Sequence, residues 1–324
     1  MPETRSPRTR SAADGSTRVV YAALAGNAAI TIAKFVAYTI SGSSAMLTEA
    51  IHSLVDSVDQ VLLLVGQARG RRPADAGHPL GHGMESYFWS FIVALMVLLL
   101  GGVASLYQGV HRIRAPEPIQ SPAISLAVLA IAAVFEGSSL SVAFREFKRV
   151  VRGRDVPLWR FIRISKDPSL YASLLEDSAA LIGIAIATVG VLASAVFHVR
   201  WADGAASIAI GGLLTAVAAV LANETRSLIA GEAVAAPVMA EITRLLRADT
   251  RIEKVNDIAT LHLGPKAVLV ALTLSFTSDL TLAELRTAIR DLTAAMQRAD
   301  ERIAYVYVRP APDPEARPHP ASSP

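Results

Sequence analysis

Six apolar runs dominate this chain of 324 residues. Each is long enough to cross a bilayer as a helix, which takes about 20 consecutive apolar residues. Hydrophobic residues make up 52% of the chain and charged residues 18%, which is too apolar for an ordinary soluble protein. The sequence therefore predicts an α-helical membrane protein with six transmembrane helices. The expected spans are residues 19–40, 44–66, 86–110, 122–145, 170–197 and 202–222.

After residue 222 the pattern changes to that of a small soluble domain. Apolar residues at helical spacing predict helices at Met239–Leu246 and Leu282–Met296, and β-rich segments predict strands at Ile258–Leu263, Ala267–Phe276 and Ile303–Val308. We therefore expect four parts along the chain. They are a disordered N-terminal tail at 1–17, the six-span domain at 18–222, a small α+β cytoplasmic domain at 223–310 and a disordered Pro-rich tail at 311–324.

Basic residues gather at the ends of the apolar runs. The net charge is +3, but the placement of Lys and Arg indicates membrane topology rather than binding to nucleic acid. They concentrate before the first run and in the second and fourth connections, whereas the opposite connections carry only Arg112, Arg114 and Arg200. By the positive-inside rule both termini are predicted to be cytoplasmic. Residues 1–18 are polar, so no cleavable signal is expected.

Ionisable side chains interrupt two of the runs. His52 and Asp56 lie in the second run, and Glu176 and Asp177 lie in the fifth. An ionisable group at membrane depth is costly unless it has a partner, so such residues usually mark an ion or substrate path. His52 and Asp56 are one helical turn apart and project from one face, with Glu49 a turn earlier on the same side. The alternative is a structural His–Asp pair that bonds across helices.

The residue types restrict what these groups can bind. The fifth run contains no basic residue that could neutralise its two carboxylates, so we expect a cation between the two runs. The chain has no cysteine, so a metal must be held by nitrogen and oxygen atoms of His, Asp and Glu.

A second cluster of metal-ligating residue types follows the second run. Asp75, His78 and His82 lie close together in the connection between the second and third spans. The same segment is also a plausible structural turn, because Gly77, Pro79 and Gly81 interleave with it. Both interpretations, a possible secondary metal site and a turn, stay open.

The segments Glu49–Asp56 and His78–Gly83, together with the layout of six spans and a small domain, resemble the cation diffusion facilitator family of divalent metal-ion transporters. The aromatic run Tyr87–Trp89 and the segment Pro168–Gly183 look closest to its zinc transporter 9-like branch and the bacterial relatives of that branch. The resemblance covers about residues 18–310.

The resemblance implies proton-coupled efflux of divalent cations, usually zinc, from the cytoplasm by a homodimer that works through alternating access. It implies no enzymatic activity and no cofactor beyond the transported cation. The expected partners are divalent metal ions, protons, the lipid bilayer and a second copy of the chain. The expected location is the bacterial inner (plasma) membrane, and the C-terminal domain is expected to dimerise.

Four positions match the transport site that the family implies. They are His52 and Asp56 in the second span and Ser173 and Asp177 in the fifth. Ser173 departs from the pattern, since many members have His or Asp there and a neutral hydroxyl is a poor zinc ligand. Glu176 is the candidate for the missing oxygen ligand, with water as the alternative. One imidazole with two or three carboxylates is a harder site than a His-rich one, so it also admits manganese, iron or cobalt.

Two further classes of function remain open. The chain could be a membrane metal sensor or scaffold without transport, in which the buried charges hold the bundle together. A membrane enzyme that uses a metal is the other alternative, but the chain lacks motifs such as His-Glu-x-x-His.

Overall fold

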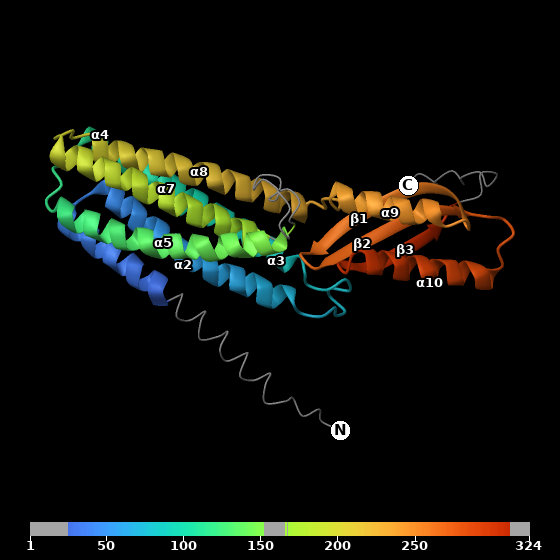
Figure 1. Cartoon of the computed structure of the whole chain (residues 1–324). Helices are drawn as coiled ribbons and strands as arrows, with labels where there is room; N and C mark the ends of the chain where they lie inside the picture. Colours follow the sequence, from blue (N-terminus) through green and yellow to red (C-terminus); the bar gives the residue numbers. More distant parts are fainter. Residues whose placement is uncertain (1–24, 152–165, 167, 312–324) are drawn as a thin grey trace, which may run out of the picture. The chain divides into compact units, whose positions relative to one another are not determined.

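The computed structural model describes residues 25–151, 166 and 168–311. Long helices make up the first part of the described chain, and a small sheet with two helices makes up the last (Figure 1). A helix at residues 25–41 precedes α2 (Ser44–Gly70), and α3 (Glu85–Met96), a π-helical segment (Val97–Val103) and α4 (Ala104–Arg114) form one continuous rod. The remaining long helices are α5 (Pro122–Val150), α7 (Pro168–Val196) and α8 (Ala202–Ile229). Nearly all of both predicted tails lies outside the described residues.

Four of the described helices are long and apolar enough to cross a membrane, at Glu85–Arg114, Pro122–Val150, Leu170–Val196 and Ala202–Ile229. They coincide with the last four predicted spans. The predicted first span begins in residues that the structure does not describe, and α2 carries several ionisable residues along its length. The class of helical membrane protein is therefore supported, and the count of six spans stays a prediction.

The chain folds into two compact units, which are described separately. The first contains residues up to Gly66 and residues Phe88–Thr225, and the second contains Gln67–Tyr87 and the chain from Arg226 onward. We call them the membrane unit and the sheet unit. The connection that carries Asp75, His78 and His82 therefore belongs to the sheet unit, although it lies between two predicted spans.

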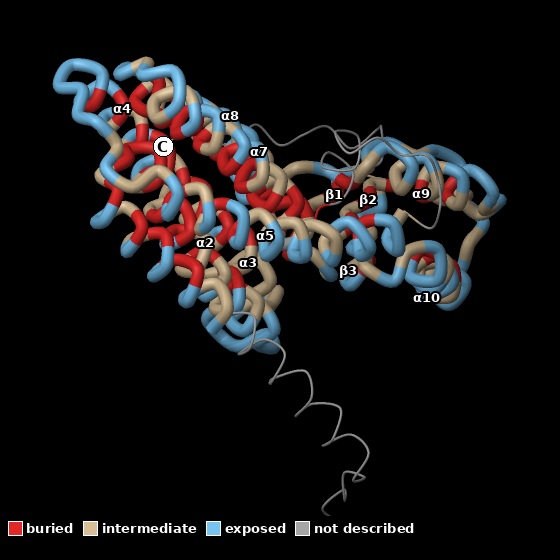
Figure 2. Tube along the Cα trace, turned by 60° about the vertical axis from the view of Figure 1, so that its left-hand side comes forward, coloured by how far each residue is buried: buried red, intermediate tan, exposed pale blue. Residues whose placement is uncertain are grey.

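Glycines allow α8 to pack closely against α4 and the π-helical segment. A Cβ atom at Gly211 would lie 2.8 Å from the backbone nitrogen of Leu106, and one at Gly109 would lie 2.7 Å from the carbonyl oxygen of Gly204. Backbone-to-backbone packing of this kind needs residues without side chains. Figure 2 shows buried segments alternating with exposed ones along the helices of this unit.

The N-terminus of α2 is held by a residue far away in the sequence. Asp203, in the first turn of α8, accepts hydrogen bonds from the backbone nitrogens of Ser44 (2.6 Å) and Ala45 (3.2 Å). Its carboxylate also accepts from the hydroxyls of Ser43 and Ser44. An acid satisfies the free N–H groups of a helix start and interacts favourably with its dipole. Asp203 thus ties α8 to α2, the helix that carries His52.

The sheet unit contains an α+β fold with the predicted order of elements. Helix α9 (Ala236–Ala248) precedes β1 (Ile252–Gly264) and β2 (Ala267–Phe276), and α10 (Leu282–Ala299) precedes β3 (Ile303–Pro310). The strand order is β1-β2-β3, antiparallel between β1 and β2 and parallel between β2 and β3. Alternate residues of β2 are buried, and they share one core with side chains of both helices. Both helices therefore cover the same face of the sheet.

Candidate functional site

The predicted membrane residues lie on α2 and α7 and are largely buried. His52 is 3% exposed, Glu176 4% and Asp177 6%. Asp56 and Ser173 are half-buried. Both helices contribute to the main apolar core of the membrane unit, so their polar faces are held by the packing around them.

One close approach sets the level at which α2 and α7 meet. A Cβ atom at Gly183 on α7 would lie 2.5 Å from Oε1 of Glu49 on α2. The continuous rod from α3 to α4 and helix α5 lie between α2 and α7 in the chain. Because successive long helices run in opposite directions, α2 and α7 are antiparallel. From this point, about two helical turns forward along α2 lead to Asp56, and about two turns back along α7 lead to Glu176. The two carboxylates therefore lie at a similar level.

The carboxylates of the two helices form one electrostatic group. Asp56 interacts with Glu176 and Asp177, and Glu176 interacts with Asp59. Asp59 follows Asp56 by three residues, on the same face of α2. A set of buried acids from two helices attracts cations, because several negative charges in a poorly solvated place repel one another unless a proton or metal ion intervenes.

Neighbouring side chains orient two of these acids. Ser139 on α5 donates a hydrogen bond to Oδ2 of Asp177 at 2.9 Å, and Gln60 donates one to Oδ2 of Asp56 at 3.3 Å. Helices α5 and α7 are extensively packed together, which holds Ser139 near its acceptor. Three helices thus contribute to the polar group.

The buried Lys34 is already engaged. Its ammonium group lies 3.0 Å from Oε2 of Glu49 and donates to the hydroxyl of Ser53 at 2.6 Å, with both charged side chains fully buried. Glu49, noted in the sequence as a neighbour of His52, is thus one member of an ion pair.

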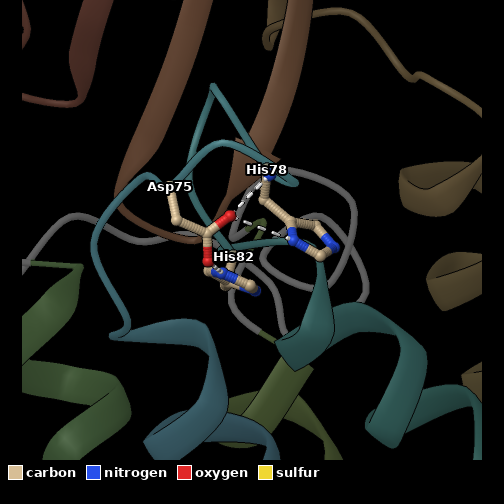
Figure 3. A group of neighbouring side chains, drawn as sticks. All are labelled: Asp75, His78 and His82. Carbon is tan, nitrogen blue, oxygen red and sulfur yellow. Dashed lines mark hydrogen bonds and ion pairs between the residues drawn. The ribbon is translucent and has the colours of Figure 1, made fainter.

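The loop cluster of Asp75, His78 and His82 is the tighter of the two groups. In the part of the chain that the structure describes, it is the group of three His, Asp or Glu residues whose ligand atoms all lie within 4.8 Å of one another. Figure 3 shows both imidazoles beside the Asp75 carboxylate, with His82 Nε2 at 2.9 Å from Oδ2 and His78 Nδ1 at 3.5 Å from Oδ1. The membrane acids would have to draw closer together to hold an ion as tightly.

Asp75 also closes the turn in which it lies. Its Oδ1 accepts hydrogen bonds from the backbone nitrogens of Gly77 (2.9 Å) and His78 (2.7 Å). The bond with the His82 side chain, followed by the bond from His78, lowers the pKa of Asp75 to about 2. Asp75 is therefore ionised at every pH above about 4, and its bonds weaken only as the pH falls from there through 2. These bonds fit the structural turn and leave a charged ligand available for a metal.

The loop is also packed on the tip of the β1–β2 hairpin. Gly83 lies against the carbonyl oxygen of Leu263, and a Cβ atom at Gly264 would lie 2.8 Å from the Cα of Gly83. Two glycines are needed for such close approach of two backbones. The loop cluster and the hairpin therefore form one continuous part of the sheet unit.

A comparison with family models identifies the class of protein. The model described as the cation efflux transmembrane domain matches residues 20–230, well over half of the chain. The chain belongs to the cation efflux family. This match and the similarity to zinc antiporter SLC30A9 confirm the resemblance to the cation diffusion facilitator family and to its zinc transporter 9-like branch.

Curated relatives of this cation efflux protein carry names of metal transporters. The human proton-coupled zinc antiporter SLC30A9, mitochondrial, is 31% identical over 261 residues, which is 80% of this chain and 46% of that protein. Metal tolerance protein C4 of Arabidopsis thaliana is 30% identical over 250 residues, covering 77% and 55% of the two chains. The magnetosome protein MamM of Magnetospirillum gryphiswaldense is 31% identical over 87 residues, or 27% of each chain. This chain spans about half the length of the first two relatives.

Two residues near the candidate site were not predicted from the sequence. Asp59 is fully buried beside the predicted ligands, and Ser139 contacts Asp177 from another helix. The signal for Asp59 was present, because it lies three residues after Asp56 and seven after His52 on one helix face. Ser139 gave no signal, since a serine in an apolar helix is common and its partner lies 38 residues away. The ligand set itself stays a prediction.

Proposed function

We propose that this protein moves divalent metal cations across a membrane in exchange for protons, with zinc as the first substrate. The observation that carries the proposal is the interaction of Asp56 on α2 with Glu176 and Asp177 on α7, one helical turn from the buried His52 and inside the part of the chain that matches the cation efflux transmembrane domain. The relatives named as zinc antiporters support zinc as the substrate.

Exchange follows from the chemistry of the four side chains. An imidazole binds a metal only in its neutral form, and carboxylates bind it only when ionised, so metal entry displaces protons. When the helices turn the group toward the opposite side, protons return to the same atoms and the metal leaves.

The direction of transport is proposed from the positions of basic residues. Both termini and the loop cluster lie on the side with more Lys and Arg, and export proceeds from that side to the other. The mammalian and amphibian relatives are named mitochondrial, so they give no support to the bacterial inner membrane as the location. Direction is therefore defined relative to the basic connections.

A second copy of the chain is part of the proposal. The helices α9 and α10 share a core on one face of the sheet, which leaves the opposite face of β2 half-buried at Leu269 and Ala271. A homodimer through the sheet unit would cover that face. Light scattering of the full chain in detergent should give twice the chain mass of 34.3 kDa, whereas a single chain mass would contradict the dimer.

Reconstitution tests the function. Full-length protein in sealed liposomes should accumulate zinc when a pH gradient is imposed, and an internal pH dye should report protons moving the opposite way. Liposomes without protein give the background. Zinc binding without any flux would favour a sensor or scaffold instead, and the same assay across zinc, manganese, iron and cobalt ranks the substrates.

A further inference from the structure

Asp59 is the most unusual acid in the membrane unit. Its side chain is 0% exposed, and neither of its carboxylate oxygens has a hydrogen-bond partner among the residues that the structure describes. Buried polar groups are nearly always hydrogen-bonded, and an unpartnered buried acid calls for a ligand or a proton.

Glu176 is the matching group on α7. It is 4% exposed, its Oε1 also lacks a hydrogen-bond partner in the described chain, and it interacts electrostatically with Asp59. The two acids come from separate helices, so no local turn explains their arrangement. Glu176 is itself one of the predicted ligands, whereas Asp59 is not, and Asp59 is roughly 4.5 Å further along the α2 axis than Asp56.

Two buried basic residues of the membrane unit pair with acids other than Asp59 and Glu176. Lys34 is bonded to Glu49 and Ser53, and Arg112 is 3.4 Å from Asp203. Neither is therefore available as the counter-charge for Asp59.

We propose that Asp59 and Glu176 form a second divalent-cation position, about one turn of α2 beyond Asp56 in the direction of the C-terminal end of that helix. This position rests on the proposed function, because it would receive the ion before or after the His52 position during transport. Glu176 has two carboxylate oxygens and bridges the two positions. An all-oxygen position favours hard ions, so manganese should bind it better than a His-containing site does.

Equilibrium binding to the full-length protein in detergent tests the position. The parent variant is His78→Ala with His82→Ala, so that the loop cluster does not contribute to the signal. In this parent, Asp59→Asn should weaken manganese binding about tenfold or more and zinc binding less, because a carboxylate ligand is lost while the volume is kept. Asp59→Glu should retain most of the manganese affinity. Glu224→Gln, which neutralises a half-buried acid on α8, is the matched control and should bind both metals like the parent.

A double variant separates a shared ion from two independent effects. If Asp59 and Glu176 hold the same ion, Asp59→Asn combined with Glu176→Gln should lose little more manganese affinity than the stronger single change. Additive losses would overturn the shared position. Unchanged manganese and zinc affinities in Asp59→Asn, at wild-type thermal stability, would overturn the proposal outright. If Asp59→Asn does not fold, Glu176→Gln carries the same readout, and unchanged manganese affinity there is equally decisive.

Binding and flux distinguish this proposal from the function on which it rests. If the wild-type protein binds manganese through Asp59 but moves no metal in liposomes, the second cation position stands and the proposed transport function is wrong. If the wild-type protein transports zinc and the Asp59→Asn variant binds both metals normally, the transport function stands and the second cation position is wrong.

Discussion

At the residue scale, the proposed transport depends on a few polar side chains in apolar helices. His52 is the imidazole of the proposed transport group, and burial leaves it dependent on its neighbours for any bond. Its Nδ1 has no hydrogen-bond partner in the described part of the chain, so a ring nitrogen is free to bind a metal.

The first prediction concerns that imidazole. His52→Ala should lower zinc flux about 100-fold or more, a larger loss than the 10–100-fold typical of residues that only orient a ligand. The fold should be retained, because a polar group is removed from a membrane interior. His52→Asp should retain part of the flux and shift the preference from zinc toward manganese. Zinc and manganese flux in liposomes tests this prediction. If both variants keep the wild-type rate and the wild-type preference between the two metals, His52 is not part of the site.

The second prediction separates Ser173 from its acidic neighbours. Asp177→Asn should eliminate zinc flux, Glu176→Gln should raise the apparent Km for zinc, and Ser173→Ala should change little, because the hydroxyl is a poor metal ligand. Ser173→His should raise zinc affinity relative to manganese. The opposite pattern, with Ser173→Ala inactive and Glu176→Gln normal, would show that the hydroxyl coordinates the ion.

At this scale the sequence predicted which ionisable side chains lie within the long apolar helices but not all of their contacts. His52, Asp56, Glu176 and Asp177 stood out because ionisable residues are rare in apolar runs. Sequence spacing does not tell which of several acids the long side chain of Lys34 reaches, so its bond with Glu49 could not be predicted. Hydrogen bonds between distant helices, such as Ser139 to Asp177, depend on packing that no local pattern encodes.

At the element scale, close helix packing depends on particular glycines. The sequence contains the glycine pairs Gly101-Gly102 and Gly211-Gly212, and the structure shows that the two members of the second pair are not equivalent. Gly211 lies against the backbone of the neighbouring rod, whereas a Cβ atom at Gly212 would have no atom within 4 Å.

The third prediction uses this difference. Gly211→Ala should lower the free energy of unfolding by about 1–3 kcal/mol, because the backbone of Leu106 cannot move away cheaply. Gly212→Ala is the matched control and should be neutral or stabilising by up to about 1 kcal/mol, since alanine favours the helix. Thermal unfolding in detergent measures both. Equal effects of the two substitutions would contradict the packing described for α8.

The loop cluster joins two kinds of element, a turn and a possible metal site. The sequence placed Asp75, His78 and His82 together but could not choose between the two, and the structure supports the turn through its backbone bonds while leaving the side chains suitably placed for a metal. Its packing on the β1–β2 hairpin could not be predicted, because it joins segments far apart in the sequence.

The fourth prediction asks what the loop does. His78→Ala with His82→Ala should remove one weak zinc-binding event per chain and raise the apparent Km of transport, while the maximal flux stays nearly the same. Protonation of Asp75 should not affect binding above about pH 4, because its pKa is lowered to about 2. His111→Ala, which removes an exposed imidazole from α4, is the control. A less stable protein with unchanged zinc stoichiometry would show that the cluster is only a turn.

At the scale of the whole molecule, the chain combines a helical membrane unit with a small sheet unit. The order of helices and strands in the sheet unit followed from apolar periodicity, and four of the six predicted spans have matching helices. The span at α2 is harder to establish from composition, because its polar residues, which include the proposed ligands His52 and Asp56, lower its hydropathy. The match to the cation efflux transmembrane domain covers residues 20–230, which include the described residues of the membrane unit.

The most direct test of the central claim is zinc flux in liposomes that contain either wild-type protein or Asp56→Asn, reconstituted at equal density under the same pH gradient. The substitution keeps the size of the side chain and removes a charge that the proposed exchange requires. The account predicts rapid zinc accumulation with opposite proton movement for the wild type and background rates of both for the variant. Equal zinc flux in the two preparations, or zinc movement without any proton movement, would contradict it.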